Sequence, residues 1–190
     1  MRTERTAALR TDTKDRIIDA AEEVVLRDGV SRLTLEAAAA EAGLSKGGVL
    51  YHFPTRDALV AGMVGKIIEE FDADIEYLRE GDTGPGSFTR GYIRATMDPV
   101  SPRPDREDRL GAAVIAAAAA QPALLAPLQR ASDRWQSQLE DDGLDPTVAT
   151  VVRLACDGLW LCDLFGLAPP TAARRAQVGV ELERLTGPNS

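Results

Sequence analysis

Apolar residues recur along the chain at the three- and four-residue spacing of amphipathic helices, and no segment alternates with the period of two that is typical of strands. The first run begins with an N-cap at Asp12 or Thr13 and is stopped at Gly29. It carries its apolar residues on one face, namely Ile17, Ala21, Val24 and Val25. This pattern predicts a helix over residues 13–28.

Three more helices are predicted next because hydroxyl residues that favour N-caps precede them, at Thr34, Ser45 and Thr55. The first ends at Gly43 and the second at Pro54. The third keeps its apolar spacing as far as the break EGDTGPGS in residues 80–87. Two short helices are therefore followed by a long one.

The rest of the chain is divided by the breakers DPVSPRPDRED, Pro122, DDGLDP and GLAPP. Five further helices are expected between them, at about 88–97, 106–120, 123–141, 146–166 and 171–186. The sequence thus predicts an all-α fold of about nine helices.

Composition fits a globular protein. The chain has 190 residues, of which 44% are hydrophobic, and this is enough to bury a substantial core. It contains no run of about 18 uncharged apolar residues, and its first residues, MRTERTAALRTDTKDR, lack an apolar signal segment. We therefore expect a cytoplasmic protein that does not enter a membrane.

The cysteines and the single histidine offer no disulfide and no metal site. Cys156 and Cys162 lie six residues apart in a predicted helix. This separates them by about 9 Å along the axis and turns them to different sides. With His52 as the only histidine, the usual ligand spacings of a zinc site cannot be assembled. No cofactor is expected.

The net charge of -8 argues against nucleic-acid binding, but the distribution of the charges along the chain removes this objection. Residues 1–60 hold nine Lys and Arg against ten Asp and Glu, which leaves thirteen against twenty in the remaining residues. The acidic excess therefore belongs to the C-terminal two-thirds. A DNA-binding module in the first 60 residues needs only a few well-placed cations.

Two short helices joined by Gly43, Leu44 and Ser45 make a helix-turn-helix, whose second helix enters the major groove of DNA N-terminus first. Gly47 and Gly48 stand at the start of that helix although each costs about 1 kcal/mol relative to Ala. Without Cβ atoms they allow the helix start to approach base edges or phosphates. The alternative is that they permit a tight helix–helix crossing.

Other polar residues near this turn also have two interpretations. Lys46 is either solvated or faces DNA, which would explain a cation at a helix start, where the helix dipole disfavours it. Tyr51 and His52 are either ordinary surface or core residues or phosphate contacts. Lys14, at the start of the first helix, is a further candidate for contact with the DNA backbone.

The segment TLEAAAAEAGLSKGGVLYHFPTRDAL, preceded by DRIIDAAEEVVLRDGVSRL, resembles the DNA-binding domain of the tetracycline-repressor (TetR) family of bacterial regulators. The match covers residues 13–62. The positions that fall at the family's register are Thr34, Ala39, Gly43, Ser45, Gly47, Leu50, Tyr51, His52, Phe53 and Leu59.

This resemblance implies roles for individual residues. Those expected to face the major groove are Ser45, Lys46, Gly47, Gly48 and Leu50, and those expected to hold phosphates are Thr34, Tyr51, His52 and Arg56. It also implies a domain order: a flexible arm over residues 1–12, a helix-turn-helix domain over 13–55, and a ligand-binding and dimerisation domain over 56–190.

The C-terminal part resembles the second domain of the same family, and RLACDGLWLCDLFGL is similar to the penultimate helix of a subgroup that includes multidrug-responsive repressors. The resemblance implies a homodimer through a four-helix interface made of the helices at about 146–166 and 171–186.

Candidates for the lining of an effector pocket are Met97, Leu128, Trp135 and Trp160, although such residues at helical spacing are more often core. Asp157 shares a side of its helix with Trp160, where a carboxylate beside an aromatic ring suits a cationic lipophilic ligand. A salt bridge from Asp157 to Arg153 is the alternative.

Together these observations predict a transcriptional repressor that is released from a pseudo-palindromic double-stranded DNA operator when a small lipophilic molecule binds. The alternatives are a ligand-dependent activator and a helical ligand-binding protein that has lost DNA binding. An enzyme is not expected, because the sequence offers no nucleophile with a base, no metal set and no phosphate loop.

Overall fold

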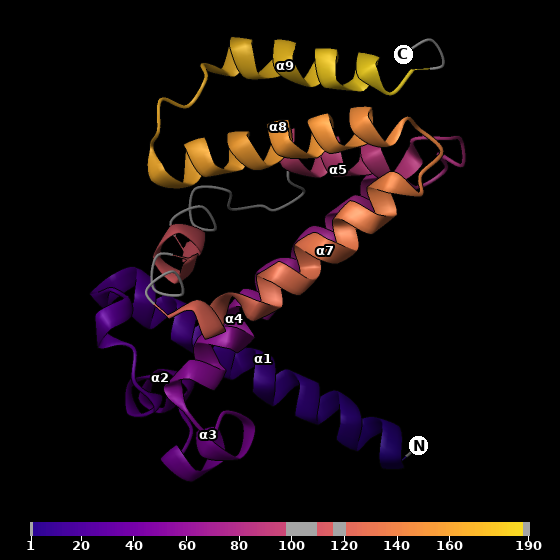
Figure 1. The fold of residues 1–190 in the computed structure, drawn as a ribbon. Coiled ribbons are helices and arrows are strands. Elements are labelled where there is room, and N and C mark those ends of the chain that lie inside the picture. Colours follow the sequence, from indigo (N-terminus) through magenta and orange to yellow (C-terminus); the bar gives the residue numbers. More distant parts are fainter. Residues whose placement is uncertain (1, 98–109, 116–120, 188–190) are drawn as a thin grey trace. The chain divides into compact units, whose positions relative to one another are not determined.

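The computed structural model describes residues 2–97, 110–115 and 121–187, and every regular element in these ranges is helical. This confirms the all-α prediction (Figure 1). The elements are α1 (Arg2–Asp28), η1 (Val30–Arg32), α2 (Leu35–Ala42), α3 (Lys46–His52), α4 (Arg56–Leu78), α5 (Ser87–Met97), a helix at 110–115, η2 (Pro122–Leu125), α7 (Ala126–Glu140), α8 (Pro146–Phe165) and α9 (Ala172–Leu185). None of the helices in the described ranges combines the length and the apolar character needed to cross a bilayer.

The chain divides into two compact units. The first contains residues 1–66 and 109–127, and the second contains residues 67–108 and 128–190. We predicted a domain boundary between residues 55 and 56, whereas the first unit also includes the start of α4. The reason is that Leu59 and Met63 of α4 are fully buried and that Phe53 packs against α4 at Gly62.

The polar caps predicted for the first unit are present. The hydroxyl of Thr34 accepts a hydrogen bond from the Ala37 amide at 3.0 Å, that of Ser45 from the Gly48 amide at 3.1 Å, and that of Thr55 from the Ala58 amide at 3.0 Å. Gly43 closes α2 in the left-handed conformation, with φ of 64°. Each cap satisfies a backbone group that the helix end would leave without a partner.

Helix α1 begins earlier than predicted. We expected a start at Asp12 or Thr13 after a flexible arm, but α1 runs from Arg2 without interruption. The segment RTERTAALR contains no Gly or Pro and is rich in Ala, Arg, Leu and Glu, which favour helices. A polar residue such as Asp12 marks a helix start only where the preceding residues cannot extend the helix.

An ion-pair cluster ties α4 to α1 inside the first unit. The ammonium of Lys66 lies 2.6 Å from a carboxylate oxygen of Asp19 and 3.0 Å from one of Glu22. Glu22 is buried, and a buried carboxylate requires such a partner. The last residue of α4 in this unit is thereby fixed to the C-terminal half of α1.

Helix α5 is the centre of the second unit. It contacts α8 and α9, which lie side by side and run antiparallel (Figure 1). Most of α5 is buried, and Gly91 allows it to pass close to α4, since a Cβ there would lie 2.9 Å from the carbonyl oxygen of Ile75. No side chain larger than hydrogen fits this crossing without movement of the backbone.

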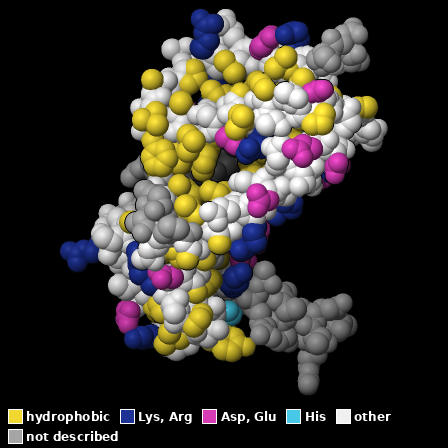
Figure 2. Space-filling view, in the orientation of Figure 1, with side chains coloured by type: hydrophobic (Ala, Val, Ile, Leu, Met, Phe, Trp, Pro, Cys, Tyr) yellow, Lys and Arg dark blue, Asp and Glu magenta, His cyan; other side chains and the backbone are white. Residues whose placement is uncertain are grey.

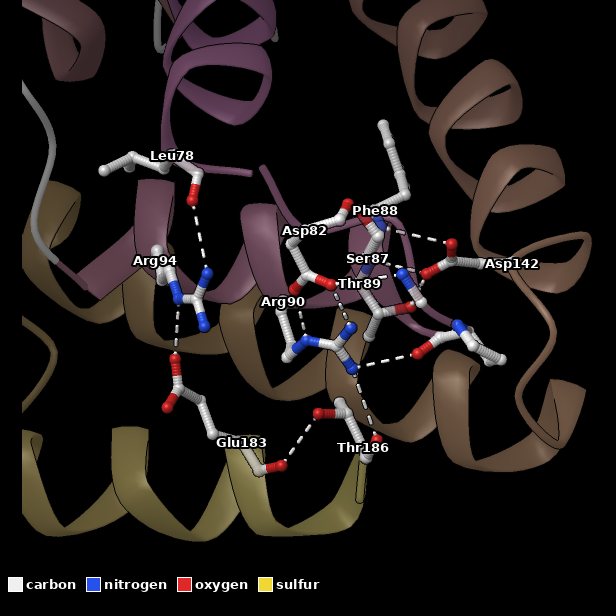
Figure 3. Close-up of polar contacts among 12 residues, drawn as sticks. Leu78, Asp82, Ser87, Phe88, Thr89, Arg90, Arg94, Asp142, Glu183 and Thr186 are labelled. Atoms are coloured by element: carbon white, nitrogen blue, oxygen red, sulfur yellow. Dashed lines mark hydrogen bonds and ion pairs between the residues drawn. The ribbon is translucent and has the colours of Figure 1, made fainter. Parts of the chain in front are cut away.

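The N-terminus of α5 is capped from a distant part of the chain. Asp142, in the link between α7 and α8, accepts hydrogen bonds from the Phe88 amide at 3.1 Å and from the Thr89 amide and hydroxyl at 2.7 and 2.8 Å (Figure 3). Amides at a helix start have no acceptor within the helix, and a negative charge there interacts favourably with the positive end of the helix dipole. Asp142 thus joins two segments that are far apart in sequence.

Two arginines of α5 complete this network. The guanidinium of Arg90 makes two 2.7 Å contacts with the carboxylate of Asp82 and lowers the pKa of that carboxyl. Arg94 donates to the carboxylate of Glu183 in α9 at 2.8 Å and to the carbonyl of Leu78 at the end of α4 at 3.2 Å (Figure 3). Polar contacts therefore connect α5 to the segments on either side of it.

The remaining helix boundaries follow the sequence with small shifts. The predicted helix at 123–141 is split into η2 and α7, because Pro122 starts a short 3-10 turn before the α-helix begins. The helix predicted at 106–120 is seen at 110–115, and its other residues lie outside the described part of the chain. Helices α8 and α9 agree with their predicted ranges to within one residue.

Candidate nucleic-acid interface

The turn between α2 and α3 has the geometry of a helix-turn-helix. Gly43 reverses the chain, and the Leu44 amide returns to the carbonyl of Ala39 at 2.9 Å. Ser45 then starts α3 three residues after α2 ends. The predicted motif is therefore formed with short, well-capped ends.

One face of α3 is anchored and the opposite face is exposed. Val49 is fully buried and fixes the helix to the core of the first unit. Lys46, Gly47, Leu50 and Tyr51 are exposed, and 71% of the Tyr51 surface is accessible. An exposed Leu and Tyr beside two glycines are unusual for a solvated helix face, and they fit a surface that contacts another molecule.

The atoms around Gly47 and Gly48 show whether either glycine permits a tight helix–helix crossing within the chain. A Cβ added at Gly47 would have the Ser45 hydroxyl oxygen as its nearest neighbour, at 3.9 Å, and one at Gly48 would have the same atom at 3.5 Å. Both distances are ordinary van der Waals contacts with a neighbouring side chain. In the described structure neither glycine lies at a helix–helix crossing, in contrast to Gly62 and Gly91.

Lys46 has a partner that the sequence did not indicate. Its ammonium lies 2.6 Å from a carboxylate oxygen of Glu36, in the first turn of α2. The hydrogen bond from Lys46 lowers the pKa of the Glu36 carboxyl. The charge of Lys46 is thus balanced in the free protein by a residue of the neighbouring helix.

The predicted phosphate-binding residues lie around the same end of the first unit. The rings of Tyr51 and His52 meet edge to face, with centroids 5.1 Å apart, and His52 is half-buried. The hydroxyl of Thr34 caps α2 at an exposed position, and Lys14 is exposed on α1. Contact of these residues with DNA phosphates stays a prediction.

Arg56 has a structural role that the sequence did not indicate. Its guanidinium donates to the carbonyl of Leu33 at 2.9 Å and to that of Val30 at 3.0 Å. These carbonyls belong to η1 and the residue that follows it, which link α1 to α2. Arg56 therefore fixes this link to the start of α4, a role that no local sequence pattern reveals.

In the second unit, Trp135 and Asp157 are connected through Tyr92. The Tyr92 hydroxyl donates to a carboxylate oxygen of Asp157 at 2.7 Å, and the ring centroids of Tyr92 and Trp135 lie 6.0 Å apart. Phe71 contacts both rings, at 5.1 and 5.2 Å. Burial, followed by the charge of Asp157, raises the pKa of Tyr92, so this hydroxyl remains a donor. Phe71 and Tyr92 are not among the predicted ligand residues, although helical spacing places them on inward faces.

The carboxylates beside this aromatic cluster already have cationic partners. Asp157 is 2.8 Å from the guanidinium of Arg153, which is the salt bridge considered as an alternative from the sequence. Asp72 accepts from the Trp135 indole at 2.7 Å and pairs with Arg134. The aromatic cluster therefore carries no uncompensated negative charge on Asp157 or Asp72.

The other candidate ligand residues are distributed around the second unit. Leu128 and Trp160 are half-buried, on α7 and α8. Met97 lies at the end of α5, where its Cγ would be 3.3 Å from a Cβ added at Gly179 of α9. Of the predicted ligand residues, Trp135 and Asp157 are connected by the described contacts, through Tyr92.

Helices α8 and α9 expose an apolar surface. Hydrophobic side chains gather over α8 and its link to α9 (Figure 2). The large exposed residues of α8, of its link to α9 and of α9 itself are Val151, Leu154, Leu161, Phe165, Leu167 and Val180. Those of α8 are separated by three, seven and four residues. Gly158, with nothing within 4 Å of an added Cβ, divides the gap of seven, so that the positions alternate by three and four residues. This is the spacing of a seam that packs against another helix.

Comparison with known families matches both parts of the chain. Residues 17–63 match the family described as bacterial regulatory proteins, tetR family, and residues 86–187 match the tetracyclin repressor-like C-terminal domain. The second match alone covers more than half of the chain.

The sequence relatives match about a quarter of this chain. The HTH-type transcriptional regulator SrpR of Pseudomonas putida is 49% identical over 49 residues, which are 26% of this chain and 23% of SrpR. The uncharacterized HTH-type transcriptional regulator TtgW, also from Pseudomonas putida, is 47% identical over 49 residues, which are 37% of its length. The chain therefore matches between about a quarter and about a third of the length of these relatives.

Solved structures match nearly the whole chain. The multidrug binding protein EbrR in complex with ethidium is 26% identical, with a TM-score of 0.68 over 92% of this chain and 99% of EbrR. A transcriptional regulator from Rhodococcus sp. is 20% identical, with a TM-score of 0.73 over 93% of this chain and all of that chain. The second likeness shows the same fold.

Proposed function

The chain belongs to the TetR family of DNA-binding transcriptional regulators, and from this premise we propose that it is a homodimeric repressor released from a pseudo-palindromic operator by a small lipophilic molecule. The observation that carries the DNA-binding part is the exposed face of α3, which presents Leu50 and Tyr51 together with two glycines whose Cβ positions would meet only the Ser45 hydroxyl. Such a face suits close approach to a groove rather than packing inside the chain.

The proposed contacts follow from the position of each residue. Ser45, Lys46, Gly47, Gly48 and Leu50 lie on or beside the start of α3 and would face the major groove. Lys14, Thr34, Tyr51, His52 and Arg56 would contact the DNA backbone. Arg56 would do so while two of its nitrogens remain engaged with Leu33 and Val30.

The direct test is selection from a pool of random duplex DNA by the full-length protein. We expect enrichment of sequences with two inverted half-sites, because a two-fold symmetric dimer presents two copies of α3. Failure to enrich any sequence at low salt would contradict the proposed function.

A Gly47→Ala variant should keep or increase thermal stability and bind the selected DNA more weakly. Ala is favoured over Gly in a helix by about 0.5–1 kcal/mol where φ is negative, and the added Cβ meets only the Ser45 hydroxyl at 3.9 Å. On DNA the methyl would occupy the closest approach, at a cost on the order of 1 kcal/mol or more per half-site. Thermal melting and operator titration on the same variant measure both effects; reduced stability with unchanged affinity would contradict this role for Gly47.

The proposed dimer uses α8 and α9, because the described core of one chain leaves several of their large apolar side chains exposed. Gly158 would lie where a helix of the second copy approaches most closely, since the space around it is open. A second copy would bring the same seam, so the surface can satisfy itself across a two-fold axis.

The proposed effector binds next to Phe71, Tyr92 and Trp135 in the second unit. Aromatic rings with a few polar partners are typical of sites for small lipophilic molecules, and EbrR, a relative in structure, was solved with ethidium. Because Asp157 and Asp72 are already paired with arginines, a positive charge on the effector would have to compete with Arg153 or Arg134.

Ethidium is therefore a suitable first probe, and it should quench the fluorescence of Trp135 more than that of Trp160. The reason is that Trp135 of α7 makes ring contacts with Phe71 and Tyr92, whereas Trp160 of α8 is not among the rings in contact in this cluster. Single-tryptophan variants, Trp160→Phe and Trp135→Phe, separate the two signals. Quenching confined to Trp160 would contradict the proposed location of the site.

A further inference from the structure

The ion pair between Lys46 and Glu36 lies on the surface that we propose contacts DNA. Lys46 is the single Lys or Arg of α3, whose sequence is KGGVLYH, and Glu36 belongs to α2. Their charged atoms are 2.6 Å apart, and both side chains are more than half exposed. The one strong cation of the recognition helix is therefore held by a carboxylate at the place where a polyanion would bind.

A lysine without such a partner is a flexible point charge, and beside DNA it binds the nearest phosphate. A carboxylate at hydrogen-bonding distance changes this preference. It cancels most of the attraction of the ammonium for phosphate, and it is itself repelled by phosphate oxygens. It leaves two N–H donors of the ammonium free to bind neutral acceptor atoms.

Neutral acceptors are what the major groove presents on base edges, and guanine offers two of them, O6 and N7. Gly47, next to Lys46, has no Cβ to keep the start of α3 away from the base edges. The pair therefore suits contact with a base better than contact with the DNA backbone.

We propose that Glu36 orients the ammonium of Lys46 toward a guanine edge, so that this pair of residues specifies one base of each half-site. The proposal rests on the proposed DNA-binding function. Glu36 is in this view a positioning residue, which acts through Lys46 and does not itself contact the base.

Two other roles for the pair make different predictions. If Glu36 only braces α2 against α3, its replacement changes stability but not base preference. If Glu36 only weakens binding by its charge, its replacement strengthens binding to every sequence equally and leaves base preference intact.

The experiment compares the wild-type protein with Glu36→Gln and Lys46→Met. Each protein selects duplexes from a random pool, and its affinity is then measured for the wild-type consensus duplex and for a shuffled duplex, over a range of salt concentrations. The matched control is Glu41→Gln, which removes a carboxylate of α2 that pairs with Arg27 at 2.8 Å instead of with Lys46.

We expect the wild-type protein to require guanine at one symmetric position, and both Glu36→Gln and Lys46→Met to lose that requirement while the other positions remain. Discrimination at that position should fall by about 5-fold or more, the lower end for one base contact. Glu36→Gln should also bind the shuffled duplex several-fold more tightly and with a steeper salt dependence, because the released Lys46 then binds phosphate. Glu41→Gln should retain the base preference.

Retained guanine preference in Glu36→Gln would overturn the proposal. So would a Lys46→Met variant whose salt slope is shallower by about one per subunit with base preference unchanged, because Lys46 would then be a phosphate contact. If the wild-type protein itself selects no sequence, the proposed function fails, and this outcome is distinct from either result.

Discussion

A Leu154→Arg variant should be a folded monomer that has lost most of its affinity for operator DNA. Leu154 is 56% exposed and lies in the apolar seam of α8, one turn before Gly158. In a monomer an arginine there is solvated and harmless. In the proposed dimer its unpaired charge would be buried between two apolar helices, at a cost of about 3 kcal/mol or more.

The loss of DNA binding follows from the loss of the dimer. Two linked half-site contacts bind about 100- to 10,000-fold more tightly than one, so a monomer forfeits that factor. Light scattering gives the mass of the variant, circular dichroism its helix content, and titration its affinity. The control is Gln138→Arg, which adds the same side chain at an exposed position of α7. A dimeric Leu154→Arg variant would place the interface elsewhere.

The second large effect is expected from Asp142→Ala, which should destabilise the second unit by about 2–4 kcal/mol. The substitution leaves the amides of Phe88 and Thr89 without their acceptor, together with the Thr89 hydroxyl. Thr89 is fully buried, so water cannot easily replace the carboxylate. A buried donor without a partner costs about 1–3 kcal/mol.

Urea denaturation of the variants measures this effect and tests its cause. Asp142→Asn keeps one acceptor oxygen and should lose less stability than Asp142→Ala. Asp141→Ala removes the neighbouring exposed carboxylate and should stay within about 0.5 kcal/mol of the wild type. Equal midpoints for Asp141→Ala and Asp142→Ala would show that the cap contributes nothing to stability.

Those parts of the fold that are encoded locally were predictable from the sequence. Thr34, Ser45 and Thr55 each cap the helix that follows within three residues, and Gly43 needs only its own left-handed φ to end α2. Because these signals act over one turn, the helix-turn-helix and most helix ends could be read directly. The glycines of α3 were also recognised, since their poor helix propensity stands out in the sequence.

The contacts that were missed join residues far apart in the chain. Asp142 caps a helix 54 residues earlier in the sequence, and Tyr92 reaches Asp157 across 65 residues. Lys46 and Glu36 are close in sequence, but their pairing depends on the angle between α2 and α3, which periodicity does not give. The early start of α1 differs from the prediction because the helix-forming residues before Asp12 continue the helix through this possible cap.

The two hydrogen bonds from Arg56 to the link between α1 and α2 matter for genetic screens. In a screen for loss of the proposed repression, substitutions of Arg56 are expected among the variants, and the place of Arg56 beside the helix-turn-helix invites their interpretation as lost DNA contacts. Removal of this side chain also frees the carbonyls of Val30 and Leu33, and in cells a partly unfolded regulator is degraded. The amount of each variant in the cell should therefore be measured before its phenotype is assigned to the operator.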